Sequence, residues 1–228
     1  IKKGQIIVDI DLNFDETGNI KNDYEINAIL KDGKIELFKN YNFENINFLL
    51  NVKKNNYDFK DIKFIKNNSK FFSESIKIVK DEEDFIIEGN IGNKDTILKN
   101  ELLKFLNIDL KSIGFFNTNF NSISKFSFLI DKKFKVKNLI LDSNIQVIES
   151  DYKVSNFSNN HFEIKNNILK LKNHNIRFSI KNNKKIINGS GKIKIQENFD
   201  EIKYNIDLND QDFKLNSQLT LSELKLNR

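Results

Sequence analysis

The feature that most constrains the fold is an alternation of apolar and polar residues that recurs along nearly the whole chain. It is clearest in the segments 6–14, 24–30, 46–52 and 202–208. Successive side chains of a β-strand point to opposite faces of the sheet, so each such segment has one apolar and one polar face. Roughly fifteen segments of this kind follow one another at the spacing of a meander. The pattern predicts an all-β protein made of a long, twisted, mostly antiparallel meander.

One segment departs from the alternation. Apolar residues at helical spacing, preceded by a suitable N-cap at Asp95 or Thr96, predict one short helix near residues 96–107. The predicted divisions of the chain are a β-meander over 1–94, the helix and a connecting segment over 95–123, and a second β-meander over 124–228. We expect the two meanders to form one continuous sheet.

Turns are predicted where Asn, Asp and Gly interrupt the apolar segments. Asp32-Gly33 is typical of a two-residue hairpin turn. By the same reasoning, Asp142 and Asn173 each separate two short strands. The segment that follows Gly114 is predicted to be a loop whose aromatic side chains pack under the sheet.

The composition bounds the class of protein. Hydrophobic residues make up 39% of the chain and charged residues 30%, which is typical of a folded protein. The 37 basic and 32 acidic residues are interspersed, whereas a protein that binds nucleic acid usually concentrates its basic residues, so we expect no nucleic-acid partner. The chain contains no Cys, which excludes disulfides and a cysteine nucleophile. It also contains no Met and so no initiator residue, which predicts a fragment or processed product of a longer protein.

Motifs of enzymes and metal sites are missing from the sequence. His161 and His174 are the only histidines, and each lies among Asn and Lys, which is typical of a solvated surface histidine. The acidic run 81–84 lacks the ligand spacing of a Ca²⁺ loop, and no helix follows Gly189-Ser190-Gly191 to hold a phosphate. We therefore expect no catalytic residue, no metal site and no cofactor, and we do not expect an enzyme.

An apolar face that no helix covers must either pack against another sheet or remain open to a ligand. An open sheet with this alternation would form a groove with an apolar interior, and acyl chains could cover that interior. The candidate lining residues lie on the apolar side of the predicted strands and are Ile6, Val8, Ile10, Leu12, Ile26, Leu30, Ile46, Phe48, Leu50, Phe126, Phe128, Ile130, Ile193, Ile195, Tyr204 and Ile206. In the alternative, a closed β-sandwich or jellyroll, the same residues would form the core of an interaction module.

Three stretches carry a resemblance to a known family, namely Tyr24–Ile35, Phe43–Phe48 and Phe85–Ile91. Their cadence of strand, short polar turn and strand resembles the periplasmic β-rich region of AsmA-like proteins, the group that includes YhdP and TamB. The resemblance implies a groove that transfers phospholipid through the periplasm of a Gram-negative cell or supports outer-membrane biogenesis. It also implies a parent protein anchored in the inner membrane. Because an open sheet has unpaired edges, we expect neighbouring segments of that parent chain to pair with this one. A jellyroll of the lipopolysaccharide-transport type, with a similar apolar interior, is the alternative.

Overall fold

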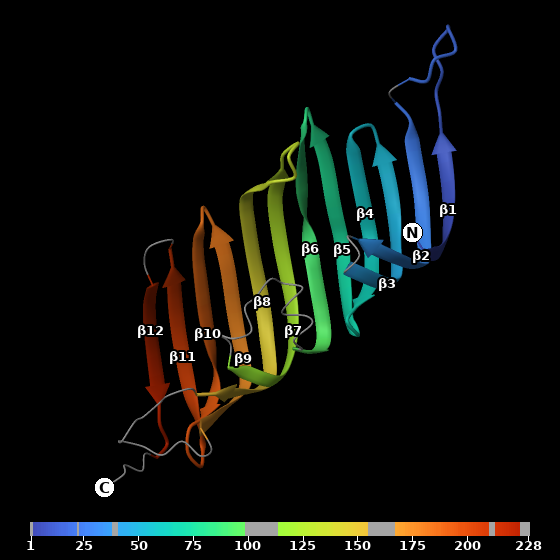
Figure 1. Ribbon diagram of the computed structural model, residues 1–228. Coiled ribbons are helices and arrows are strands. Elements are labelled where there is room, and N and C mark those ends of the chain that lie inside the picture. The colour runs from blue at the N-terminus through green and yellow to red at the C-terminus, as the bar shows by residue number, and fades with distance from the viewer. Residues whose placement is uncertain are drawn as a thin grey trace. The chain divides into compact units, whose positions relative to one another are not determined.

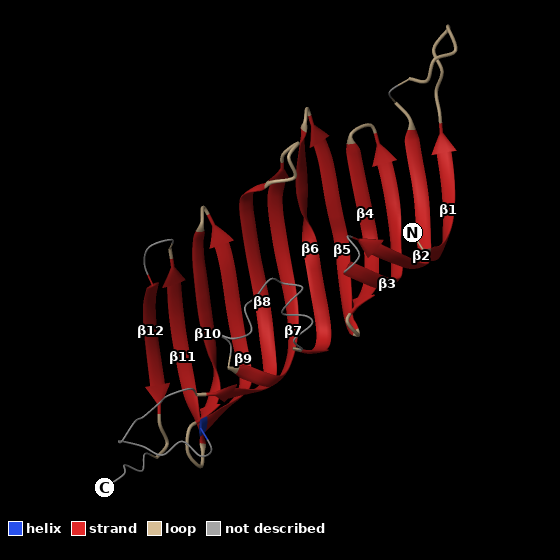
Figure 2. Ribbon diagram, in the orientation of Figure 1, coloured by secondary structure: helices blue, strands red, loops and turns tan. Residues whose placement is uncertain are grey.

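The computed structural model describes residues 2–21, 23–37, 41–98, 114–154, 167–209 and 213–223, and these residues form a succession of β-strands (Figure 1). The strands, in chain order, are β1 (Lys3–Asp11), β2 (Glu25–Leu37), β3 (Tyr41–Lys53), β4 (Asn56–Lys66), β5 (Ser69–Asp81), β6 (Asp84–Ile97), β7 (Phe115–Ile130), β8 (Val136–Lys153), β9 (Ile168–Lys181), β10 (Lys184–Lys194), β11 (Phe199–Leu208) and β12 (Phe213–Thr220). They form one open antiparallel sheet in which each strand lies beside the next in sequence (Figure 2). The predicted all-β antiparallel meander is confirmed. The described strands do not close into the alternative sandwich or jellyroll.

The predicted helix near residues 96–107 begins in a segment that the structure shows to be a strand. Thr96 and Ile97 end β6, and Asp95, an expected N-cap, lies in the same strand. The backbone N–H of Leu98 donates to the carbonyl of Thr118 at 2.8 Å. Pairing with β7 therefore outweighs the local helical spacing at this point, while residues 99–107 lie outside the described residues. No helix in the described segments is long and apolar enough to cross a membrane.

The strands are longer than the sequence predicts, because residues expected in turns lie inside them. β2 runs through Asp32 and Gly33, and it pairs with β1 and β3 on both sides of this point. β8 runs through Asp142 and β9 runs through Asn173. The segment after Gly114 forms the beginning of β7. The predicted hairpin, the two predicted breaks and the predicted loop are therefore wrong.

Asn and Asp residues inside the strands give several of them the same irregularity. The positions concerned have φ between 49° and 53° and are Asp32, Asn45, Asp61, Asp95, Asn117, Asn138 and Asn173. Asn and Asp tolerate this left-handed conformation better than other side chains do, and a bulge formed there bends the strand. Figure 1 shows such a bend at the ends of β2 and β3. Except at Asn138, the residue after each of these positions is buried, and these residues are Gly33, Ile46, Ile62, Thr96, Thr118 and His174.

Several bulges are held by an Asn side chain of the neighbouring strand. The backbone N–H of Asp32 donates to Oδ1 of Asn47 at 3.2 Å. In the same way, the N–H of Glu74 donates to Oδ1 of Asn90 at 3.0 Å, and the N–H of Asp95 donates to Oδ1 of Asn121 at 2.7 Å. A bulge removes a backbone N–H from the hydrogen-bond ladder, and leaving that group without a partner costs free energy. The side-chain amides supply the missing acceptor, so the bulges are built features of the sheet.

Contacts divide the chain into two units. Unit 1 comprises Ile1–Asn93 and Ser124–Leu141, and unit 2 comprises Lys94–Ile123 and Asp142–Arg228. The buried hydrophobic residues of the described segments are, in unit 1, Ala28, Leu30, Ile46, Val52 and Ile62, and in unit 2, Val147, Val154 and Ile193. Each unit thus has a small core, which leaves much of its apolar side-chain surface partly exposed.

Candidate functional site

The strand registers of unit 1 show which side chains share a face, because paired residues lie on the same side of a sheet. One row crosses the six strands β1 to β6 through successive pairs and consists of Val8, Ala28, Leu50, Phe59, Ile76 and Gly89. A second row on the same side consists of Ile10, Ile26, Val52, Tyr57, Ile78 and Ile87. A shorter third row consists of Ile6, Leu30 and Phe48. We call these three rows together the apolar face of unit 1.

The reverse side of the same strands is mainly polar. The row directly beside that of Val8 consists of Asp9, Asn27, Asn51, Asp58, Lys77 and Glu88. The Asn51 amide donates to the carboxylate of Glu25 at 2.7 Å and to the Asn27 side chain at 2.8 Å, so the polar groups of this side are bonded to one another. The strands of unit 1 therefore separate apolar from polar residues as the alternation predicts.

Apolar residues interrupt the polar side in two places, at the pair of Val79 and Ile86 and in a row near β1. Ile7 pairs with Ile29, and Ile29 pairs with Leu49. These residues line a shallow depression of about 280 Å³ together with polar neighbours such as Asp58 and Lys60. This row covers three strands, whereas the rows of the apolar face of unit 1 extend over as many as six.

Exposure decides which of the predicted lining residues in or next to β1, β2 and β3 a ligand can reach. On the edge strand β1, Ile6, Val8 and Ile10 are 56%, 46% and 51% exposed. Leu12 lies just after β1 and is exposed, whereas Ile26, Phe48 and Leu50 are half-buried. The remaining two of these residues, Leu30 and Ile46, are buried. The accessible part of the apolar face therefore lies toward β1, and Leu30 and Ile46 are packing residues.

Leu30 is buried because the strand bends beside it. Only 1% of Leu30 is exposed. A Cβ atom at Gly33 would lie 2.8 Å from Leu30 Cδ2, so the absence of a side chain at Gly33 makes room for Leu30. The bulge at Asp32 thus brings Gly33 against the Leu30 side chain within the same strand.

The predicted residues of β7 lie on one side of that strand. Phe126, Phe128 and Ile130 occupy alternate positions and are all half-buried. The ring centroids of Phe126 and Phe128 are 5.8 Å apart. These three residues belong to unit 1 and form a continuous apolar strip along the strand.

The predicted residues of β10 and β11 lie in unit 2. Ile193 is buried opposite Asp200, Tyr204 lies opposite Gly189, and Ile206 lies opposite Ile187. Ile195 lies just after β10 and is half-buried. One apolar row crosses the four strands β9 to β12 on this side and consists of Phe178, Ile187, Ile206 and Leu215. The polar residues Asp200 and Tyr204 lie on the same side, so the apolar surface here is less extensive than the apolar face of unit 1.

His174 is the clearest polar residue on this side of unit 2, and the prediction that it is a surface histidine is wrong. It is 2% exposed, and a Cβ atom at Gly191 would overlap its ring. Its Nε2 lies 3.0 Å from the carbonyl oxygen of Lys192, and its Nδ1 lies 3.5 Å from the Tyr204 hydroxyl. Burial lowers the pKa of His174, because the charged imidazolium loses its hydration, while the Lys192 carbonyl opposes this shift. The other histidine, His161, lies outside the described residues.

Buried hydroxyl groups accompany His174 in unit 2, and the sequence analysis missed them. The hydroxyls of Thr118 and Ser150 lie 2.6 Å apart, and Thr96 is buried as well. Thr96 and Thr118 each follow a left-handed Asp or Asn, as His174 does. An Asn or Asp inside an alternating segment was therefore the signal that could have identified Thr96, Thr118 and His174 as buried residues.

A depression of about 690 Å³ lies beside this polar region of unit 2. Its lining includes Glu149 and Asp151 together with Lys170, Lys172 and Lys194, so it carries charges of both signs. Within the described segments, no group of three or more His, Cys, Asp or Glu side chains is placed to hold a metal ion.

Comparison of the chain with protein-family models, with curated proteins and with solved structures finds no match. Function therefore has to be inferred from the residues and the geometry of the site itself. The apolar face of unit 1 is the most extensive feature of this kind in the described structure.

Proposed function

We propose that the chain is a segment of a lipid-transfer groove and that the acyl chains of a phospholipid lie on the apolar face of unit 1. The observation that supports this proposal is a set of apolar rows that crosses six strands and has a polar reverse side. The described strands form a single open sheet and supply no second layer over this face. Apolar surface of such extent marks a place where another molecule binds.

The chemistry of the face favours an acyl chain. Its rows contain aliphatic and aromatic side chains, with a hydroxyl only at Tyr57, so there is little to orient a polar ligand. An acyl chain needs no hydrogen bonds, and each buried methylene contributes about 0.8 kcal/mol. Five inter-strand steps of about 4.8 Å extend over about 24 Å. This distance exceeds the roughly 15 Å that one leaflet of a bilayer core provides for an acyl chain.

The cellular setting of the proposal rests on the sequence. The resemblance of Tyr24–Ile35, Phe43–Phe48 and Phe85–Ile91 to AsmA-like proteins supports a role in periplasmic phospholipid transport or outer-membrane biogenesis. The edge strands β1 and β12 each pair on one side only in the described sheet. Neighbouring segments of a longer parent chain are the proposed partners of these edges, since an unpaired strand edge can accept another strand.

The first prediction uses two adjacent exposed residues on opposite sides of β1. The chain is expressed in the periplasm, and co-purified lipids are measured by mass spectrometry. We expect phospholipid to be retained by the wild type, lost in Val8→Glu and retained in Ile7→Glu, because only Val8 lies on the apolar face of unit 1. Each variant places one charge on an exposed edge position, so neither should unfold the sheet.

A second variant tests the middle of the face. Phe48→Glu places a charge beside the Phe59 ring, whose centroid lies 5.3 Å from that of Phe48. We expect the Phe48→Glu variant to lose bound lipid as well. Circular dichroism shows whether the variant is still folded. A folded wild type without lipid, or equal loss of lipid in Val8→Glu and Ile7→Glu, would contradict the proposal.

A further inference from the structure

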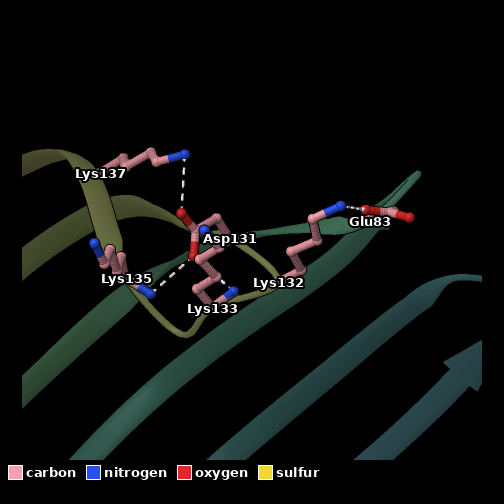
Figure 3. Close-up of polar contacts among 6 residues, drawn as sticks. All are labelled: Glu83, Asp131, Lys132, Lys133, Lys135 and Lys137. Carbon is pink, nitrogen blue, oxygen red and sulfur yellow. Dashed lines mark hydrogen bonds and ion pairs between the residues drawn. The ribbon is translucent and has the colours of Figure 1, made fainter.

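The hairpin tip that joins β7 to β8, residues 131–137, has an unusual combination of side chains. Phe134 is 87% exposed, and its backbone φ is 58°. The remaining residues of the tip include four lysines, which are Lys132, Lys133, Lys135 and Lys137 (Figure 3). All of these residues belong to unit 1.

The conformation of this tip is fixed by Asp131. The Asp131 carboxylate accepts hydrogen bonds from the backbone N–H groups of Lys133 at 2.9 Å and Lys135 at 3.0 Å, and it forms an ion pair with Lys137 at 3.0 Å (Figure 3). The N–H of Phe134 donates to the Asp131 carbonyl at 2.8 Å. The backbone bond from Lys135 and the Lys137 ammonium lower the pKa of Asp131, so this brace is charged at neutral pH.

The stability of the fold does not account for Phe134. A bulky side chain at positive φ is unfavourable, and a side chain exposed to this degree contributes little packing. The turn between β9 and β10 meets the same backbone requirement with Asn182 and Asn183, at φ of 50° and 61°. A Phe at such a position is therefore best explained by a contact with another molecule.

The charges around Phe134 indicate the nature of that contact. Lys132 is paired with Glu83 of the β5–β6 hairpin at 2.6 Å, and Lys137 is paired with Asp131 (Figure 3). Lys133 and Lys135 flank Phe134, are exposed, and form no ion pair with any described residue. Val136, next along the chain, is 57% exposed. The tip thus presents two apolar side chains between ammonium groups that are free to meet an anionic surface.

We propose that this tip docks the protein on an anionic phospholipid surface, with Phe134 entering the boundary between headgroups and acyl chains and Lys133 and Lys135 facing the phosphates. Aromatic residues favour this boundary, and lysines keep their ammonium groups at the headgroups while their stems lie along apolar material. Stacking of nucleic-acid bases would instead call for a basic groove with several aromatic platforms, and the tip is a protrusion with one ring. The proposal does not depend on the groove.

The test measures binding of the full chain to sedimented vesicles at about 0.1 M salt. One set of vesicles is phosphatidylcholine, and the other also contains about 30 mol% phosphatidylglycerol. We expect the wild type to bind the anionic vesicles only and to be released by higher salt. Lys133→Gln and Lys135→Gln should each weaken binding about fivefold. Phe134→Gly should weaken it about tenfold or more, because the inserted ring is lost.

Two controls separate docking from folding and from general charge. Glycine readily adopts positive φ, so Phe134→Gly should keep or raise the urea midpoint of unfolding while it loses vesicle binding. The β9–β10 tip is also basic but has no aromatic residue, so Lys184→Gln together with Lys185→Gln should change binding less than twofold.

Several outcomes would overturn the proposal. The wild type could bind neutral and anionic vesicles equally, or bind neither. The Phe134→Gly variant could bind anionic vesicles as well as the wild type does. Finally, the wild type could bind a single-stranded oligonucleotide and lose that binding in Phe134→Gly. Lipid retention is a separate readout that depends on Val8. Failure of vesicle docking and failure of the proposed groove can therefore be told apart.

Discussion

At the scale of single residues, His174 shows how unit 2 differs from unit 1. It occupies the buried position after a bulge, where unit 1 has Ile46 or Ile62. An imidazole can be buried there because its ring nitrogens lie near the Lys192 carbonyl and the Tyr204 hydroxyl. Burial in this form favours the neutral ring, and this preference links the stability of the protein to pH.

We predict that protonation of His174 destabilises the fold as the pH falls. The pKa of His174 is lowered by burial in the folded state, so the unfolded chain takes up the proton first, near the usual value of about 6.5. The free energy of unfolding should therefore decrease between pH 7.5 and about 5.5. The His174→Gln variant can still donate a hydrogen bond to Lys192 and should lose this part of the slope. Urea denaturation at both pH values measures it.

The comparison with the variant isolates His174. His161 is present in both proteins, so its own titration cancels in the difference. A His174→Gln variant with the same pH dependence as the wild type would show that His174 is not buried in its neutral form.

At the scale of elements, the strands are defined by their bulges as much as by their alternation. Asp61 lies inside β4 at φ of 51°, and β4 and β5 pair on both sides of it. Its side chain is exposed, while Ile62 after it is buried. The strand therefore bends at Asp61 without a break in its pairing.

We predict that the backbone conformation at Asp61 can be tested with two substitutions. Asp61→Gly should leave the free energy of unfolding close to that of the wild type, because glycine tolerates positive φ. Asp61→Val should lower it by about 1–2 kcal/mol, because a β-branched residue is strained there. Urea denaturation of both variants provides the measurement. Equal stability of the two variants would mean that residue 61 has an ordinary extended conformation.

The bulges also explain which parts of the structure could be predicted from the sequence. Alternation identified the strands and placed Val8, Leu50 and Phe48 on one side, because side-chain period in a strand is a local property. It failed at Asp32 and Asn173, because Asn and Asp favour left-handed conformations in turns and in bulges alike, and only pairing with neighbouring strands distinguishes the two. Burial beside a bulge is equally non-local, so the packing of Leu30 could not be read from its own segment.

At the scale of the whole molecule, the central claim is that an open sheet leaves an apolar face available for acyl chains. The rows through Val8 and Asp9 are neighbours in sequence on every strand from β1 to β6, yet one is apolar and the other polar. An apolar face of this extent marks a place where another molecule or other protein binds. Identification of what lies against Val8 therefore tests the claim most directly.

The measurement is photocrosslinking with benzoylphenylalanine placed at Val8 in one protein and at Asp9 in another, followed by mass spectrometry of the adducts. Both positions lie on the edge strand β1 and are exposed, so the probe should not disturb the fold. We predict phospholipid adducts at position 8 and none at position 9. Adducts of protein alone at position 8, or the same lipid adducts at both positions, would contradict an open lipid-binding face.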